Sequence, residues 1–180
     1  LEEPLISSLK SKGVNILLAE MQSQGITNKF TQVAILAVLA KESNLNPKSE
    51  RCYNNTSLAR IREIWPYFKK WDDAKLTALK SDCKAFFNYT YEQARSGRRK
   101  YGNRPGTDDG YNYRGRGFNQ VTFRGSYKKY AELTGVDILN NPDLLNEPRT
   151  AAKVAVKFLS NRLNSKFKTN NPPFATQDEA

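Results

Sequence analysis

The stretch that most constrains the fold runs from Phe30 to Tyr53. Its first part is apolar at nearly every position, and the apolar residues follow the 3.6-residue repeat of an α-helix. We therefore expect an interior helix, closed by the turn around Pro47. Glu42 leaves the last turn of this helix from an apolar face, so burial should disfavour its charged form. A second acid, Glu50, follows eight residues later on a loop.

Two acids in different environments are what the hydrolysis of a glycosidic bond requires. A desolvated carboxylic acid can protonate the leaving oxygen, while a solvated carboxylate can activate water. The same two residues also fit an ordinary surface, because a Glu near a helix C-terminus is usually solvated and the chain has 18 acidic residues. These acids alone leave both interpretations open.

The composition indicates a folded and strongly basic protein. With 180 residues, 38% of them hydrophobic, the chain suits one compact domain that can bury a core and has room for two lobes. The net charge of +11 favours a polyanionic partner, and nucleic acid, an anionic bacterial wall and an acidic membrane surface all qualify. The absence of His excludes Ser-His-Asp and Cys-His catalysis and the usual zinc sites. We expect carboxylate chemistry that needs no metal and no cofactor.

The remaining global features narrow the class of protein further. Cys52 and Cys83 fit neither a CxxC site nor a dense disulfide framework, so either one bridge or two buried thiols is compatible with the sequence. No run approaches the roughly 20 apolar residues of a membrane span, so we expect no membrane insertion. The chain opens with Leu-Glu-Glu-Pro, as an excised domain or a processed product would.

Apolar periodicity predicts a mainly α chain without internal repeats. Capping and breaking residues such as Ser57, Asp82 and Gly135 mark the helix ends. Residues 96–110 have loop composition, and the alternation over 111–123 weakly indicates a short strand. We assign residues 1–164 to one catalytic domain and 165–180 to a loosely held tail. Helices are expected near residues 5–24, in one piece or two, and near 30–42, 57–65, 73–79, 82–96, 126–134 and 151–162.

The most specific motif lies between Asp109 and Leu145, where the chain reads DGYNYRGRGFNQVTFRGSYKKYAELTGVDILNNPDLL. This stretch resembles the family 19 glycoside hydrolases, which are chitinases and phage endolysins of lysozyme-like fold. The family pattern is Tyr-x-Gly-Arg-Gly-x-x-Gln-Leu-Ser/Thr, then an aromatic-rich helix and Gly-Val-Asp-Leu-x-x-Asn-Pro. The positions that match are Tyr113, Gly115, Arg116, Gly117, Gln120, Thr122, Gly135, Val136, Asp137, Asn141, Pro142 and Leu144.

The resemblance implies a role for each matching residue. Glu42 stands where the family's general acid ends its helix, and Glu50 stands where endolysin-like members carry the general base. Thr122 matches the hydroxyl that helps to hold the attacking water. Substrate contacts are implied for Gln120, Tyr53, Tyr113 and Arg116, the last two shaping the sugar cleft. The implied reaction is inverting, with carboxyl groups about 6.5 to 9.5 Å apart.

The sequence also departs from the family pattern around both acids. Lys41 precedes Glu42 where His is frequent, and Arg51-Cys52-Tyr53 follows Glu50 where endolysins tend to have Asn-Leu-Asn-Tyr. We expect an endolysin-like hydrolase of bacterial peptidoglycan, because +11 suits an anionic wall. It would act as a monomer or as a domain of a larger phage protein. Cleavage of chitin, and a noncatalytic wall-binding derivative, are the alternatives.

A nucleic-acid-binding module is the rival class. Arg116-Gly117-Phe118 with Val121 and Phe123 partly fits an RNA-recognition signature, and the protein is basic. Asn119 and Gln120 replace the small residue and the stacking aromatic of that signature. The surrounding helical periodicity supplies no four-stranded sheet, so we do not expect nucleic acid as the partner.

Overall fold

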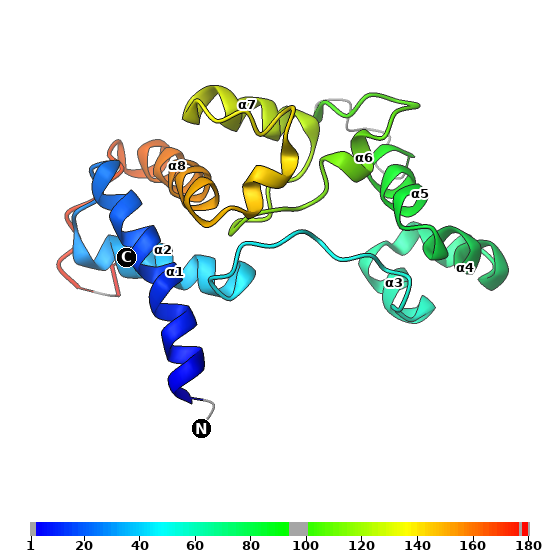
Figure 1. Cartoon of the computed structure of the whole chain (residues 1–180), viewed down its shortest axis with the longest axis horizontal. Coiled ribbons are helices and arrows are strands. Elements are labelled where there is room, and N and C mark those ends of the chain that lie inside the picture. Colours follow the sequence, from blue (N-terminus) through cyan, green and yellow to red (C-terminus); the bar gives the residue numbers. More distant parts are fainter. Residues whose placement is uncertain (1–2, 94–100, 177, 180) are drawn as a thin grey trace.

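The computed structural model describes residues 3–93, 101–176 and 178–179, and it is mainly α. No strand occurs within these ranges, and the weakly predicted strand at 111–123 is reduced to one antiparallel bridge between Arg116 and Val121. Figure 1 shows two helical lobes joined by two extended segments. The helices are α1 (Glu3–Ser23), α2 (Lys29–Ser43), α3 (Leu58–Ile64), η1 (Pro66–Lys70), α4 (Asp73–Ser81), α5 (Cys83–Asn88), η2 (Tyr89–Gln93), α6 (Asp109–Asn112), α7 (Arg124–Thr134), η4 (Pro142–Asn146) and α8 (Pro148–Phe167).

The larger lobe is built around α8, which packs against α1, α7 and η4. One side of α8 shares a core with α1 and α2, and its other side shares a second core with α7 and the segment before η4. Phe118 belongs to the first core and Val121 to the second, so the extended segment 113–123 is anchored in both. Residues buried in these cores include Leu17, Met21, Ile35, Leu39, Tyr127, Ile138, Leu145 and Val154.

The position of α2 corrects the expectation of an interior helix. Its bounds agree with the prediction, and Asn28 caps its N-terminus by accepting a hydrogen bond from the Thr31 amide at 3.0 Å. The helix buries only one face, whereas Val33 and Val38 are 44% and 45% exposed. Apolar residues all round the helix predicted burial on every side. The larger lobe covers only the face that carries Ile35 and Leu39.

The smaller lobe consists of α3, η1, α4, α5 and η2 around an aromatic core. Trp65, Phe68 and Phe86 are buried at its centre, and Tyr53 packs against it from outside the helices. Ser57 and Asp82 cap α3 and α5, as their types predicted. A disulfide between Cys52 and Cys83 ties the segment before α3 to the start of α5. It settles the pairing that the sequence left open.

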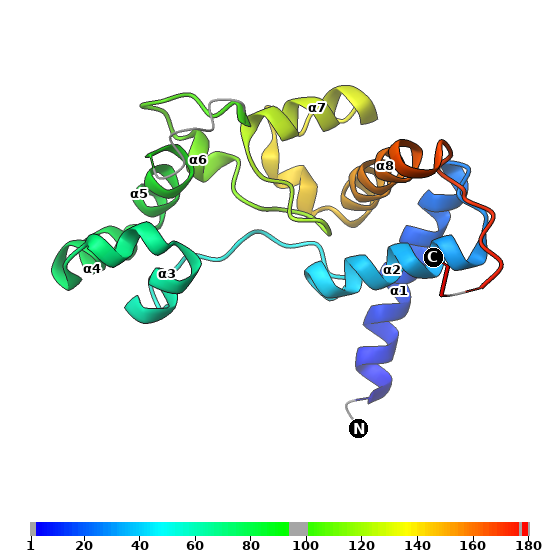
Figure 2. The same ribbon diagram turned by 180° about the vertical axis from the view of Figure 1, so that it is seen from behind.

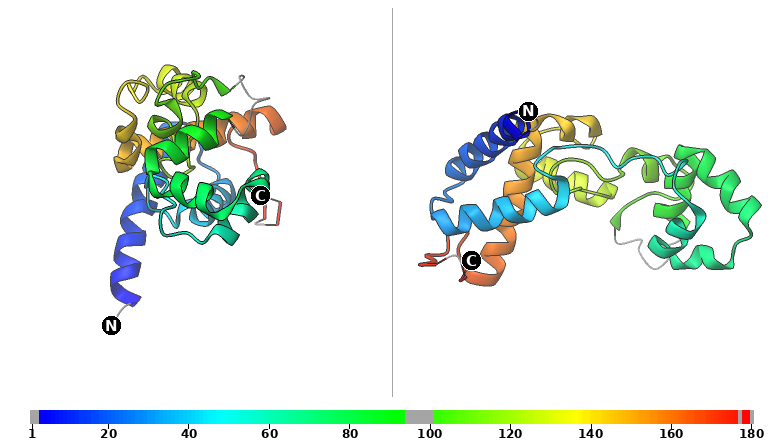
Figure 3. Two further views of the ribbon diagram at one scale, coloured as in Figure 1. Left: turned by 90° about the vertical axis from the view of Figure 1, so that its right-hand side faces the viewer. Right: turned by 90° about the horizontal axis from the view of Figure 1, so that it is seen from below.

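Two segments without regular secondary structure connect the lobes. The first is residues 44–57, between α2 and α3, and the second runs from α6 through residues 113–123 to α7 (Figures 1 and 2). Seen from below, they form the narrow waist of the molecule (Figure 3). Hydrogen bonds from Glu50 to Gly115, and from Gln120 to Lys48, hold the two segments together.

Hydrogen bonds connect the chain after α8 to the start of α2. α8 continues to Phe167, and the described residues that follow lie along the N-terminus of α2. The Asn171 side chain accepts hydrogen bonds from the amides of Thr27 and Asn28, at 2.9 and 2.7 Å. Pro172 is buried. These contacts join residues 171 and 172 to the start of α2.

None of the helices in the described ranges is both long enough and apolar enough to cross a lipid bilayer.

Breaking the disulfide should loosen the smaller lobe. Replacing both Cys52 and Cys83 by Ala should lower the free energy of unfolding by about 3 to 4 kcal/mol, because the bridge closes a loop across a separation of 31 residues. Denaturant titration of the variant and of the parent protein measures the difference. Equal stabilities would show that the aromatic core alone holds this lobe.

Candidate functional site

The waist between the lobes contains a cluster of polar groups around the carboxylate of Glu50. Glu50 lies in the middle of the connector 44–57, and its main-chain amide donates to the carbonyl oxygen of Gly115 at 2.7 Å. This backbone contact fixes the connector against the segment 113–123. It places the Glu50 side chain between the two lobes.

Three donors converge on the Glu50 carboxylate. The hydroxyl of Tyr53 donates to Oε1 at 2.9 Å, and the hydroxyl of Tyr91 lies 2.9 Å from Oε1 and 2.7 Å from Oε2. The main-chain amide of Gly115 donates to Oε2 at 3.3 Å. Two phenols and one amide therefore hold the carboxylate in one orientation.

At Gly115, Glu50 comes close to Gln120 and Thr122, two residues of the motif between Asp109 and Leu145. A Cβ atom at this position would lie 2.9 Å from Oε1 of Gln120, 3.4 Å from Oε2 of Glu50 and 3.5 Å from Oγ1 of Thr122. The three side chains thus face the same small space beside the glycine, and a side chain at residue 115 would occupy it. We call Glu50, Tyr53, Tyr91, Gly115, Gln120 and Thr122 the Glu50 cluster.

The backbone around Thr122 is held in an uncommon conformation. Gln120 and Phe123 have φ values of 49° and 74°, in the left-handed region that L-residues rarely adopt. The Gln120 side-chain amide donates to the carbonyl oxygens of Lys48 and Gly117, at 2.9 and 3.1 Å. Such strained residues concentrate at functional sites, where contacts with the surrounding structure hold them in place.

The two phenols reach Glu50 from the smaller lobe. Tyr53 packs edge to face on Trp65, and Tyr91 stacks on Phe87 and meets Phe123 edge to face. Burial, and then the negative charge of Glu50, raise the pKa of Tyr53 well above its ordinary value. Tyr53 therefore keeps its proton at neutral pH and remains a hydrogen-bond donor.

Tyr91 is the member of the cluster that sequence reasoning missed as a functional residue. It lies 41 residues from Glu50 in the sequence, and no spacing rule connects the two. Only the fold of η2 against the waist brings its hydroxyl to the carboxylate.

Tyr113 and Arg116, for which the motif implies substrate contacts, are both buried and help to hold the waist together. They are 8% and 3% exposed. The Tyr113 hydroxyl donates to the carbonyl oxygen of Leu139 at 3.1 Å. Arg116 donates to Asp143 from Nε at 2.9 Å, and from Nη1 to the Asn112 carbonyl and the Tyr127 hydroxyl. Both residues fix the strand-like segment that carries Gly115.

Glu42 departs most from the sequence-based expectation. It lies on the last turn of α2, and its side chain is exposed, so the predicted desolvation is wrong for the free protein. Four residues earlier, Val38 is exposed on the same side of the helix. Among the described residues Glu42 makes no hydrogen bond or ion pair, either with the Glu50 cluster or elsewhere.

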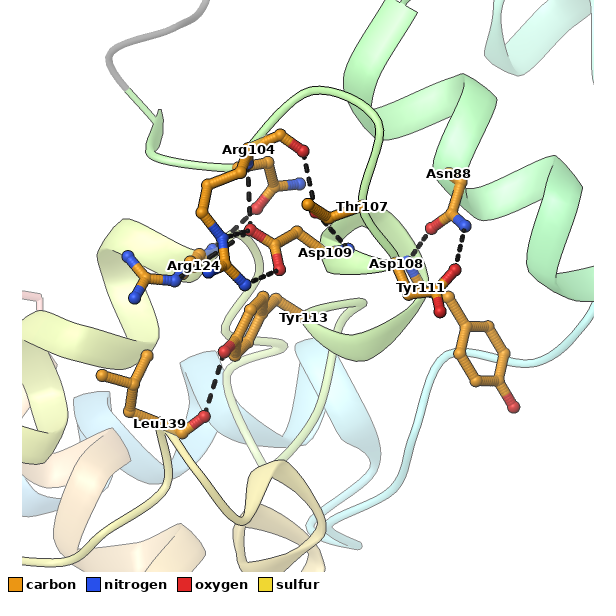
Figure 4. A network of polar contacts seen from close by, with 10 residues as sticks. Asn88, Arg104, Thr107, Asp108, Asp109, Tyr111, Tyr113, Arg124 and Leu139 are labelled. Carbon is orange, nitrogen blue, oxygen red and sulfur yellow. Dashed lines mark hydrogen bonds and ion pairs between the residues drawn. The ribbon is translucent and has the colours of Figure 1, made fainter.

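A second polar network fixes the loop that leads into the waist (Figure 4). Asp109 is 2% exposed, and it accepts hydrogen bonds from the main chain and the guanidinium of Arg104, each at 2.9 Å. Asn88 links α5 to this loop by donating to Asp108 and accepting from the Tyr111 amide. At Gly110 a Cβ atom would lie 2.6 Å from the Phe87 carbonyl oxygen, so only glycine allows this approach.

The described residues contain no group of three or more Cys, Asp or Glu side chains placed to hold a metal ion. The Glu50 cluster offers one fixed carboxylate, a hydroxyl and an amide around a small space. That combination can orient a water molecule and accept its proton. It has no thiolate or imidazole that could act as a nucleophile.

Comparison of the chain with models of known protein families finds no match, and neither does comparison with curated proteins.

The Asp109 network should give stability a defined dependence on pH. Burial raises the pKa of Asp109, but the hydrogen bonds and charge of Arg104 outweigh burial, and the pKa ends below its ordinary value. The ionised carboxylate therefore stabilises the fold above about pH 4, and this contribution is lost as the pH falls through the lowered pKa. Asp109→Asn should cost about 2 kcal/mol at pH 7.

Denaturant titration of the parent and Asp109→Asn proteins between pH 7 and pH 2.5 tests this. The difference between them should shrink as the pH falls below about 4. Asp73→Asn is the matched control, because Asp73 forms an exposed ion pair with Arg62 and should contribute little. A constant difference at every pH would show that the Asp109 carboxylate does not titrate with folding.

Proposed function

We propose that the protein is a glycoside hydrolase that cleaves β-1,4 bonds of bacterial peptidoglycan by an inverting, two-carboxylate mechanism. The observation that carries the proposal is the convergence of Glu50, Thr122 and Gln120 at Gly115. These residues come from two segments 65 or more positions apart. They are the expected base, the hydroxyl expected to hold the attacking water, and a side-chain amide expected to contact the substrate. The proposal includes a lysozyme-like fold of the family 19 type for this mainly α chain.

In the proposed reaction Glu50 is the general base. Tyr53, Tyr91 and the Gly115 amide orient its carboxylate, and Thr122 presents a hydroxyl beside it. A water molecule between the carboxylate and the hydroxyl would give its proton to Glu50 as it attacks the anomeric carbon. The fixed donors lower the reorganisation needed at the moment of attack.

Glu42 is the proposed general acid. An inverting enzyme needs its two carboxyl groups apart, with sugar and water between them, so a Glu42 that has no hydrogen bond or ion pair with the cluster suits this role. Glu42 is solvated in the free protein. A bound glycan chain crossing the waist would cover it and favour the protonated form that donates to the leaving oxygen.

The charge of the protein favours peptidoglycan over chitin as the substrate. Lys and Arg exceed Asp and Glu by 11, and a basic surface concentrates an anionic polymer near the cleft. Chitin is uncharged and gains nothing from such a surface. Peptidoglycan carries carboxylates on its peptides and lies among other anionic wall polymers.

Glu42→Gln and Glu50→Gln should each lower turnover by a factor of at least roughly 100, because each amide removes one proton transfer and keeps the shape of the side chain. The measurement is digestion of purified peptidoglycan, with borohydride reduction and mass analysis of the new ends. Glu63→Gln on exposed α3 is the matched control and should leave activity unchanged.

The products separate the candidate activities. Reduced muramic acid ends identify a muramidase, and reduced glucosamine ends identify a glucosaminidase. Cleavage of chitin alone would replace the proposed substrate. Normal activity of Glu50→Gln would remove the central claim, and failure of the parent protein to cut either polymer would favour a wall-binding derivative.

Gly115→Ala should impair catalysis more than folding. The methyl group would enter the space shared by Glu50, Gln120 and Thr122, where the attacking water is proposed to lie. We expect kcat to fall roughly tenfold or more while the melting temperature drops by only a few degrees. A rise in KM with an unchanged kcat would instead show that this space binds sugar and does not hold the attacking water.

A further inference from the structure

A hollow of about 360 Å³ lies beside the segment that carries Gly115 and contains no member of the Glu50 cluster among its lining residues. Its walls come from α6, the motif segment and the turn before η4. Two arginines face it, Arg114 and Arg116, together with the single carboxylate of Asp143. The other lining residues are Tyr111, Asn112, Tyr113, Leu139, Asn140 and Pro142.

The two guanidinium groups are held in place by the protein. Arg114 stacks over the Tyr111 ring at 4.2 Å and donates from Nη1 to the Tyr111 carbonyl oxygen at 2.9 Å. Arg116 is 3% exposed and is anchored through Nε and Nη1. Such fixed arginines lose little conformational freedom when a ligand binds.

Donor groups remain open on both arginines. Within the described residues, no hydrogen bond is made by Nε or Nη2 of Arg114, or by Nη2 of Arg116. Asp143 takes only Nε of Arg116, although a carboxylate commonly bridges two guanidinium nitrogens. The Asp143 side chain is 83% exposed, so solvent competes for this contact.

The charge in the hollow is also unbalanced. Two guanidinium groups face one carboxylate, and that carboxylate is largely in water. Burial, and then the like charge of Arg116, lower the pKa of Arg114. An anion between the two arginines would offset this repulsion and would use the open donors.

We propose that this hollow is an oxyanion-binding site, in which Arg114 and Arg116 together hold one carboxylate or phosphate group. Guanidinium groups match the planar or tetrahedral oxygens of both anions. Asp143 is the internal competitor, which an incoming oxyanion displaces from part of its contact with Arg116.

The test is a titration of the ¹⁵N-labelled protein with inorganic phosphate, and separately with acetate, at constant ionic strength. Saturable shifts of the Arg114 and Arg116 Nε signals report binding in the hollow. Arg114→Gln should weaken binding roughly tenfold, the loss of about one charge-assisted contact. Arg149→Gln, which removes an exposed positive charge at the start of α8, should leave the affinity unchanged.

Asp143→Asn is a second variant, and it should change the affinity in the opposite direction. It alters an exposed side chain. It should tighten binding, because the internal competitor becomes neutral. Glu132→Gln on α7 makes the same change in net charge away from the hollow and should tighten it less. Whichever of phosphate and acetate binds more tightly identifies the chemical class of the natural group.

Two results would overturn the proposal. One is an absence of saturable shifts with both anions. The other is equal weakening by Arg114→Gln and Arg149→Gln, which would show diffuse attraction to a basic surface. The readout is binding, so it does not depend on whether the Glu50 cluster cleaves a glycosidic bond.

Discussion

The contact between Glu50 and Gly115 is the interaction on which the arrangement of the two lobes depends. The Glu50 amide donates to the Gly115 carbonyl, and the Gly115 amide donates back to the Glu50 side chain. On one side of this contact, Cys52 and Tyr53 lead directly into the smaller lobe through the disulfide and the aromatic core. On the other side, Phe118 enters the core shared by α1, α2 and α8. The contact between Glu50 and Gly115 therefore fixes the position of each lobe relative to the other.

The waist is stable without regular secondary structure because side chains satisfy its backbone groups. Arg116 takes the carbonyl oxygens of Asn112 and Arg114, and Gln120 takes those of Lys48 and Gly117. Buried backbone groups must find partners, and here they find polar side chains in place of a helix or a sheet. The same hydrogen bonds that hold this irregular backbone also fix the groups around Glu50.

The helices were predictable from the sequence because each has its own local signals. Ser57 and Asp82 cap helices where expected, and Gly135 ends α7 with a φ of 70°. The short α6 and the exposure of Val38 were not predictable, since both depend on what packs nearby. Within the candidate site, the motif names Gln120 and Thr122, which lie near Glu50 at Gly115, but Tyr91 reaches Glu50 only through the fold. The buried roles of Tyr113 and Arg116 could not be separated from substrate contacts, because a motif records which residue types recur and not which way they point.

The exposure of Glu42 has a consequence for the proposed mechanism. Fixed donors surround Glu50, the proposed base, in the free protein, whereas Glu42, the proposed acid, is an open carboxyl group on a helix end. In the proposed mechanism the acid would acquire its desolvated environment only from the substrate. Binding energy from sugar units away from the scissile bond would go into covering Glu42, so it would appear in turnover more than in affinity. In the proposed mechanism this division would keep one carboxylate rigid and leave the other accessible to a long polymer.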